Sequence, residues 1–220
     1  MNFMAIHDGV MYAMAVILLL ATYVIIERII FFVSTMKEGK QVESYIKTHL
    51  HDKNLHQEVS ANFCNSQSPQ AQALCDIVSA EKMSHEETEY FVQSIYIAKQ
   101  PILNSRLWIL DTVVTLSPLL GLLGTILGII DAFYSLSSGT GNSDPTAVSR
   151  GIGSALYATG FGIFIALYSM VFFNYFTSKV EQINNQIKLL SLTFLAHQSR
   201  GGNVTARHAA AEVALQAVRA

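Results

Sequence analysis

The sequence carries little charge for its length. Asp, Glu, Lys and Arg together make up 14% of the 220 residues, against about 25% in a typical soluble domain. Three windows have no charged residue: Gly9–Ile26, Thr112–Ile130 and Gly151–Phe176. Each is long enough for a helix that crosses a hydrocarbon core about 30 Å thick. This deficit excludes an ordinary soluble domain and predicts an all-α, polytopic membrane protein with three transmembrane helices in the lipid bilayer.

Basic residues are absent ahead of the first window and scarce between the second and third. The missing positive start argues against a cleaved signal peptide. Lys and Arg gather instead between the first two windows and after the third, which places these segments in the cytoplasm. We therefore predict an outer N-terminus (1–8), transmembrane helices at 9–33, 107–136 and 150–176, a cytoplasmic helical region at 34–106, an outer loop at 137–149, and a cytoplasmic helix and tail at 177–220.

The cytoplasmic segments have the residue pattern of helices. After the third window, apolar residues recur every three or four positions and form an amphipathic stripe: Val180, Ile183, Ile187, Leu190 and Phe194. Residues 70–106 contain few helix breakers and show similar spacing. We expect the second and third spans to continue into the cytoplasm as long helices that pack together.

Motifs of enzymes and metal sites are missing. The stretch HEETE at 85–89 lacks the second histidine of a zinc-protease motif, and no nucleophile–base set is visible. A metal site at His49, His51, His56 and Cys64 is the alternative to solvated loop residues, but their spacing matches no common zinc pattern. Cys64 and Cys75 fall on the predicted reducing side, so we expect no disulfide. We expect no enzyme activity, metal, cofactor or nucleic-acid partner.

Small and polar residues lie within the apolar windows themselves. In the second span, one helical stripe holds Asp111, Thr115, Pro118, Leu122 and Thr125, beside Gly121, Gly124 and Gly128. In the third span, one ridge holds Gly151, Ala155 and Thr159, and a second holds Ser154, Ala158, Gly162 and Ala166. Small residues let helix backbones approach closely, and a lone threonine usually bonds within its own helix. Two polar faces together also suit a narrow, helix-lined passage.

These two spans resemble a known family. The stretches SPLLGLLGTILGIIDAF (117–133) and GIGSALYATGFGIFIALYSMVFFNYF (151–176) are similar to the second and third spans of the ExbB/TolQ/MotA proton-channel family. The likeness is strongest to the ExbB and TolQ branch, and VIIERIIFF at 24–32 is similar to the end of its first span. The match covers residues 107 to about 180.

The resemblance implies a homopentamer in the bacterial inner membrane, with the outer side facing the periplasm. Spans two and three would line a pore around an ExbD/TolR-like single-span subunit, which passes work to a TonB-like or TolA-like protein that crosses the periplasm. By position, Thr125 and Thr159 match threonines implicated in the ion path. Pro118, Gly121 and Gly124 match the packing core, and Asn174 matches an asparagine near the cytoplasmic end.

Ser154 departs from the family pattern, because ExbB and TolQ usually have glutamate there. A serine carries no charge, so we expect an aspartate of the partner to carry the proton along Thr125, Ser154 and Thr159. Asp111 and Asp131, near the ends of the second span, are secondary candidates with Asn174. A Na⁺-driven or surface-motility stator is an alternative, since hydroxyls can bind Na⁺. A non-conducting assembly scaffold is another.

Overall fold

Three helices of the described chain are long and apolar enough to cross a membrane. The computed structural model describes residues 3–49, 59, 63–64, 66, 68–78, 85–137 and 145–218. Within them the candidate spans are Ile6–Ile46, Leu107–Tyr134 and Val148–Thr193. They belong to α1 (Phe3–His49), α5 (Leu107–Ser137) and α6 (Pro145–Val218). The described elements are all helices, and three of them are apolar enough to span, as the sequence predicts.

The chain folds as two compact units. The first comprises Met1–Ile30 and Ser105–Ser178, so it contains the beginning of α1, all of α5 and the beginning of α6. The second comprises Phe31–Asn104 and Lys179–Ala220. It contains the remainder of α1 and α6 together with two shorter helices, α3 (Pro69–Val78) and α4 (His85–Leu103).

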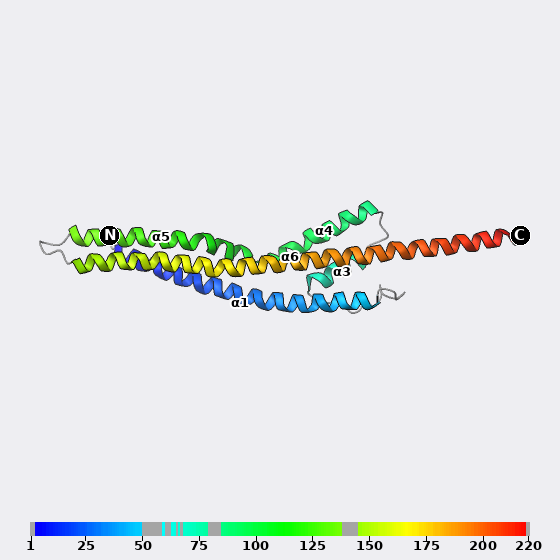
Figure 1. The fold of residues 1–220 in the computed structure, drawn as a ribbon, viewed down its shortest axis with the longest axis horizontal. Coiled ribbons are helices and arrows are strands. Elements are labelled where there is room, and N and C mark those ends of the chain that lie inside the picture. The colour runs from blue at the N-terminus through cyan, green and yellow to red at the C-terminus, as the bar shows by residue number, and fades with distance from the viewer. Residues whose placement is uncertain are drawn as a thin grey trace. The chain divides into compact units, whose positions relative to one another are not determined.

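In the first unit, α5 and the beginning of α6 lie side by side and run antiparallel (Figure 1). The buried residues of each helix recur at helical spacing, which leaves large apolar side chains exposed on the opposite faces. Exposed leucine and isoleucine at this density suit lipid or protein neighbours rather than water. The buried residues of the unit include Val10, Met14, Ala21, Val24, Ile25 and Arg28 on α1, Leu107, Leu110, Val113, Ser117 and Ala132 on α5, and Ala155, Ala158, Ile165, Ala166, Ser169 and Phe176 on α6.

In the second unit, the amphipathic stripe predicted on α6 forms part of the core. Its described members are all buried: Val180, Ile183, Ile187 and Leu190. Phe194, the last predicted member, has a side chain outside the described residues. Of the apolar residues predicted to recur between 70 and 106, Leu74 and Ile77 of α3 and Ile95 of α4 are buried. Val78 and Phe91 are half-buried, Ala98 is exposed, and Ala80 and Met83 lie outside the described residues.

The helix predicted to continue the second span into the cytoplasm is interrupted. α4 ends at Leu103 and α5 begins at Leu107, and between them Arg106 has a positive φ of 61°. A left-handed residue cannot continue a right-handed helix. Pro101, inside α4, also lacks the N–H that would bond the preceding turn. The break therefore has a local backbone cause that charge and hydropathy patterns do not register.

The expectation that Cys64 and Cys75 stay unpaired is wrong for this structure. A disulfide joins them, with Cα atoms 5.5 Å apart across a sequence separation of 11 residues. The expectation rested on the predicted compartment alone. The fold brings Cys64 next to Cys75 of α3, and this proximity is a tertiary property that the compartment does not determine.

Candidate functional site

The candidate site is the contact between α5 and α6 in the first unit, where two glycines face each other. A Cβ atom built on Gly162 would lie 2.5 Å from the carbonyl oxygen of Ser117, and one on Gly121 would lie 3.0 Å from the carbonyl oxygen of Ala158. Both neighbours are backbone atoms, which cannot rotate away. The two backbones are therefore in direct contact, and only glycine permits this separation.

The same close packing continues toward the other end of the spans. A Cβ on Gly124 would lie 2.7 Å from the Cβ of Ala158, and one on Gly128 would lie 2.8 Å from the Cβ of Ala155. A Cβ on Gly151 would lie 2.9 Å from the Cβ of Ala132. Each of these small residues of one span therefore lies directly opposite a small residue of the other span. Pro118 lies half-buried within α5.

One of the three predicted path residues bridges the two helices. The hydroxyl of Thr159 on α6 donates a hydrogen bond to the carbonyl oxygen of Gly121 on α5, at 3.2 Å. A threonine in a transmembrane helix can instead bond the carbonyl four residues earlier in its own helix. Here the two helices approach so closely at Gly121 that the hydroxyl of Thr159 reaches a carbonyl oxygen of the other helix. Thr159 therefore forms a hydrogen bond between two spans.

The other two predicted path residues bond within their own helices. The hydroxyl of Thr125 donates to the carbonyl of Leu122 at 2.7 Å, and that of Ser154 donates to the carbonyl of Gly151 at 2.9 Å. Both side chains are half-buried. The three hydroxyls make no hydrogen bond to one another, so they are separate polar points on the paired helices.

Ser169 is a polar residue of this unit that the sequence reasoning missed. It is fully buried in α6, and its hydroxyl has no hydrogen-bond partner among the described residues. A buried hydroxyl without a partner costs about 1–3 kcal/mol. The missed signal is its spacing, because Ser169 continues the stripe of Ala158, Gly162 and Ile165 that packs inward.

Along α5 and the part of α6 in this unit, the acidic residues are two aspartates toward the ends of α5. Asp111 is exposed near the start of α5, Asp131 is half-buried near its end, and Asn174 of α6 is exposed. Between Pro145 and Ser178 the sequence has no Asp or Glu. A carboxylate at the bilayer centre costs roughly 2.5–3.5 kcal/mol on insertion scales. This chain therefore provides hydroxyls and carbonyls, and no carboxylate, along α6 within the unit.

The first unit also contains a cluster of ion pairs between α1 and the residue before α5, which the sequence reasoning did not predict. The Glu27 carboxylate lies 2.9 Å from the Arg106 guanidinium and 3.2 Å from that of Arg28. Arg28 is almost fully buried, with 4% of its surface exposed. The signal was the Glu-Arg pair at the end of an apolar run. Its link to Arg106 depends on tertiary structure.

These features define the chain as a multi-pass membrane protein with a tightly packed pair of spans that carries isolated hydroxyls. Residues 47–189 match the family model described as the MotA/TolQ/ExbB proton channel family. The chain therefore belongs to the MotA/TolQ/ExbB proton channel family.

Individual relatives carry names from the same family. The ExbB-like 3 biopolymer transport protein of Synechocystis sp. is 32% identical over 185 residues, which cover 80% of this chain and 87% of that protein. The biopolymer transport protein ExbB of Aquifex aeolicus is 33% identical over 44% of this chain and 63% of its own length. The Tol-Pal system protein TolQ of Haemophilus influenzae is 38% identical over 37% of this chain and 35% of its own length.

Proposed function

We propose that this chain is the ExbB-like subunit of a motor in the bacterial inner membrane that is driven by the proton-motive force. Five copies enclose an ExbD/TolR-like single-span partner, which energises a TonB-like or TolA-like protein and through it outer-membrane processes. The N-terminus faces the periplasm and the C-terminus the cytoplasm. Membership of a proton channel family and the names of the ExbB and TolQ relatives support this assignment.

The observation that carries the proposal is the hydrogen bond from Thr159 to the Gly121 carbonyl. A pair of spans needed only for packing can be built from glycine and alanine. Here a hydroxyl and a carbonyl meet between the two helices, at the level where their backbones touch. Hydroxyls can hold two membrane helices together, and polar residues inside a membrane are also frequently functional. In our proposal, Thr125 and Ser154 are two further, separate hydroxyls along the same path.

The proton carrier in this scheme belongs to the partner subunit. Ser154 occupies the place of the usual glutamate, and α6 has no acidic residue before Glu181. A titratable aspartate on the enclosed helix supplies the missing group, while hydroxyls of this chain line its track. One charge that crosses 100 mV releases about 2.3 kcal/mol. A few protons therefore suffice for a conformational step.

Replacement of Thr159 by valine tests the proposal. Valine keeps the shape of threonine but removes the hydroxyl that reaches Gly121. Loss of one such bond is worth about 1–1.5 kcal/mol, which corresponds to about a tenfold change in rate. We expect the complex purified through a tag on the Thr159→Val chain to show about tenfold slower proton uptake in liposomes with an imposed potential. A pH-sensitive dye inside the liposomes measures the uptake.

Two control variants make this test specific. Thr177→Val removes an exposed hydroxyl of α6 whose hydrogen bond, among the residues that the structure describes, goes to the Phe173 carbonyl of its own helix, and we expect its flux to match the wild type. Thr159→Ser keeps the hydroxyl and should restore most of the flux. Equal flux in wild type and Thr159→Val would disprove the role of Thr159. Uptake that follows a Na⁺ gradient instead would favour the stator alternative.

A further inference from the structure

The disulfide lies in a segment that is anchored on both sides. Before it, the ring of Phe63 contacts that of Tyr45 on α1 edge-on, with centroids 5.2 Å apart. After it, the hydroxyl of Ser66 donates a hydrogen bond to the carboxylate of Glu38 on α1, at 2.6 Å. Cys64 is exposed between these two contacts. Two contacts other than the disulfide therefore join Phe63 and Ser66, on either side of Cys64, to α1.

The other cysteine lies on α3, which packs closely against α1. Gln70 of α3 is fully buried, and its amide donates to the Thr35 carbonyl at 3.4 Å. A Cβ built on Gly39 would lie 2.6 Å from that same amide nitrogen. Ser68 caps the helix, since its hydroxyl accepts a bond from the N–H of Ala71 at 3.2 Å. Cys75 therefore lies on a helix that is packed closely against α1.

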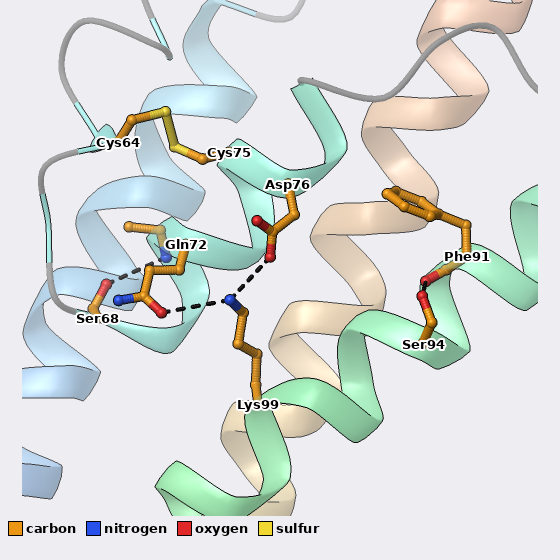
Figure 2. A network of polar contacts seen from close by, with 9 residues as sticks. Cys64, Ser68, Gln72, Cys75, Asp76, Phe91, Ser94 and Lys99 are labelled. Carbon is orange, nitrogen blue, oxygen red and sulfur yellow. Dashed lines mark hydrogen bonds and ion pairs between the residues drawn. A yellow bond between two sulfur atoms is a disulfide. The ribbon is translucent and has the colours of Figure 1, made fainter.

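Contacts from α3 also reach α4. The ammonium group of Lys99 on α4 pairs with the Asp76 carboxylate at 2.9 Å and donates to the Gln72 side chain at 3.4 Å (Figure 2). Cys75 lies between these two acceptors in the sequence. The disulfide thus joins the α1-bound segment to the part of α3 that holds α4.

We propose that Cys64 and Cys75 form a reversible redox modification site, oxidised by a peroxide and reduced by a thioredoxin-class dithiol. The proposal rests on the cytoplasmic placement of residues 34–106 within the proposed function. Disulfides inside a reducing compartment are typically transient and redox-sensing. The anchors on both sides keep the two sulfurs near each other after reduction, so the disulfide can form again within the folded protein.

The oxidation balances with hydrogen peroxide as the two-electron oxidant. The exposed Cys64 thiolate attacks one peroxide oxygen, the O–O bond breaks, and a sulfenic acid and water result after proton transfer. The half-buried Cys75 thiolate then attacks the sulfenic sulfur. The S–S bond forms, the S–O bond breaks and a second water leaves. Reduction transfers two electrons and two protons from the dithiol through a mixed disulfide.

Thiol trapping in intact cells tests the proposal with the full chain. Because the protein has two cysteines, sequential alkylation and mass tagging reports their state directly on a gel. We expect both thiols to be free in resting cells, both to be lost within minutes of peroxide addition, and both to return after its removal. In the Cys75→Ser variant, Cys64 should still react with peroxide and accumulate as a sulfenic acid, whereas Cys75 of the Cys64→Ser variant should react more slowly.

Three results would overturn the proposal. Thiols that stay free throughout peroxide treatment would exclude a redox site. A disulfide between two chains, seen as a dimer on a non-reducing gel, would exclude the internal pairing. A permanent disulfide in resting cells would exclude reversibility.

A fluorescent protein fused to the C-terminus, which fluoresces only if that end lies in the cytoplasm, reports the orientation independently. Proton uptake by the Cys64→Ser/Cys75→Ser double variant, which has no cysteine to oxidise, tests the proposed function separately from the redox site.

Discussion

At the scale of single residues, Gly162 sets how close α6 comes to α5. A Cβ atom at this position would lie 2.5 Å from the carbonyl oxygen of Ser117. Because that distance is too short, Gly162→Ala must push the helices apart. We expect this variant to lose about 1–3 kcal/mol of stability, as other overpacked sites do. A lower Tm of the purified protein in detergent measures the loss.

Gly160 provides the matched control for this prediction. It lies on the same helix, and a Cβ there would meet nothing within 4 Å. Since alanine favours a helix over glycine by up to about 1 kcal/mol, Gly160→Ala should leave the Tm unchanged or raise it. Equal losses at both positions would mean that helix propensity or detergent, rather than contact with α5, determines the effect.

At the scale of elements, the start of α5 combines an unfavourable backbone with an ion pair. The left-handed conformation of Arg106 costs about 1–2 kcal/mol relative to glycine. Its side chain is half-exposed, and its pair with Glu27 contributes about 0.2–1 kcal/mol. Arg106→Gly should therefore be more stable than Arg106→Gln, because both lose the pair and only glycine relieves the backbone.

Glu27→Gln should cost more stability than Arg106→Gln. Glu27 pairs with two guanidinium groups, and that of Arg28 is nearly buried. Loss of the carboxylate leaves a desolvated positive charge with weaker compensation, which is expensive, whereas loss of Arg106 leaves a carboxylate still paired with Arg28. Thermal unfolding of the three variants in one detergent gives the order. The reverse order would show that Arg28 does not depend on Glu27.

At the scale of the whole molecule, exposed apolar surface on α5 and α6 requires neighbours. Leu119, Phe133, Leu156, Tyr157 and Leu167 are each more than half exposed in the single chain. We expect lipid to cover part of this surface and other subunits to cover the rest. Native mass spectrometry of the tagged protein from its own membranes should show five copies with one or two copies of a small single-span protein.

Other stoichiometries would change the proposed function. Five copies without a small subunit, across several mild detergents, would favour the assembly scaffold over the motor. A monomer under the same conditions would contradict the pentamer. Peptide sequencing of a copurified small subunit shows whether it carries the aspartate that our scheme requires. A partner span without any acidic residue would remove the proposed proton carrier.

Much of the candidate site was predictable because it depends on side-chain size and helical period. Small residues at positions such as Gly121 and Gly162 mark a face where helices touch, and the period of 3.6 residues places Thr159 beside that face. The partner atom of Thr159 was not predictable. Its hydroxyl could bond its own helix or a neighbour, and only the distance between α5 and α6 decides between them.

The sequence by itself determined the class of the protein, since apolar windows without charge can satisfy their backbone in lipid only as helices, and its family, through the motifs in those windows. The tertiary structure alone decided which residues meet across the chain. The Thr159–Gly121 bond, the Glu27–Arg106 pair and the Cys64–Cys75 disulfide each join residues whose separation in sequence says nothing of their distance in space. Local patterns encode helices and their faces, whereas such contacts depend on how the faces pack.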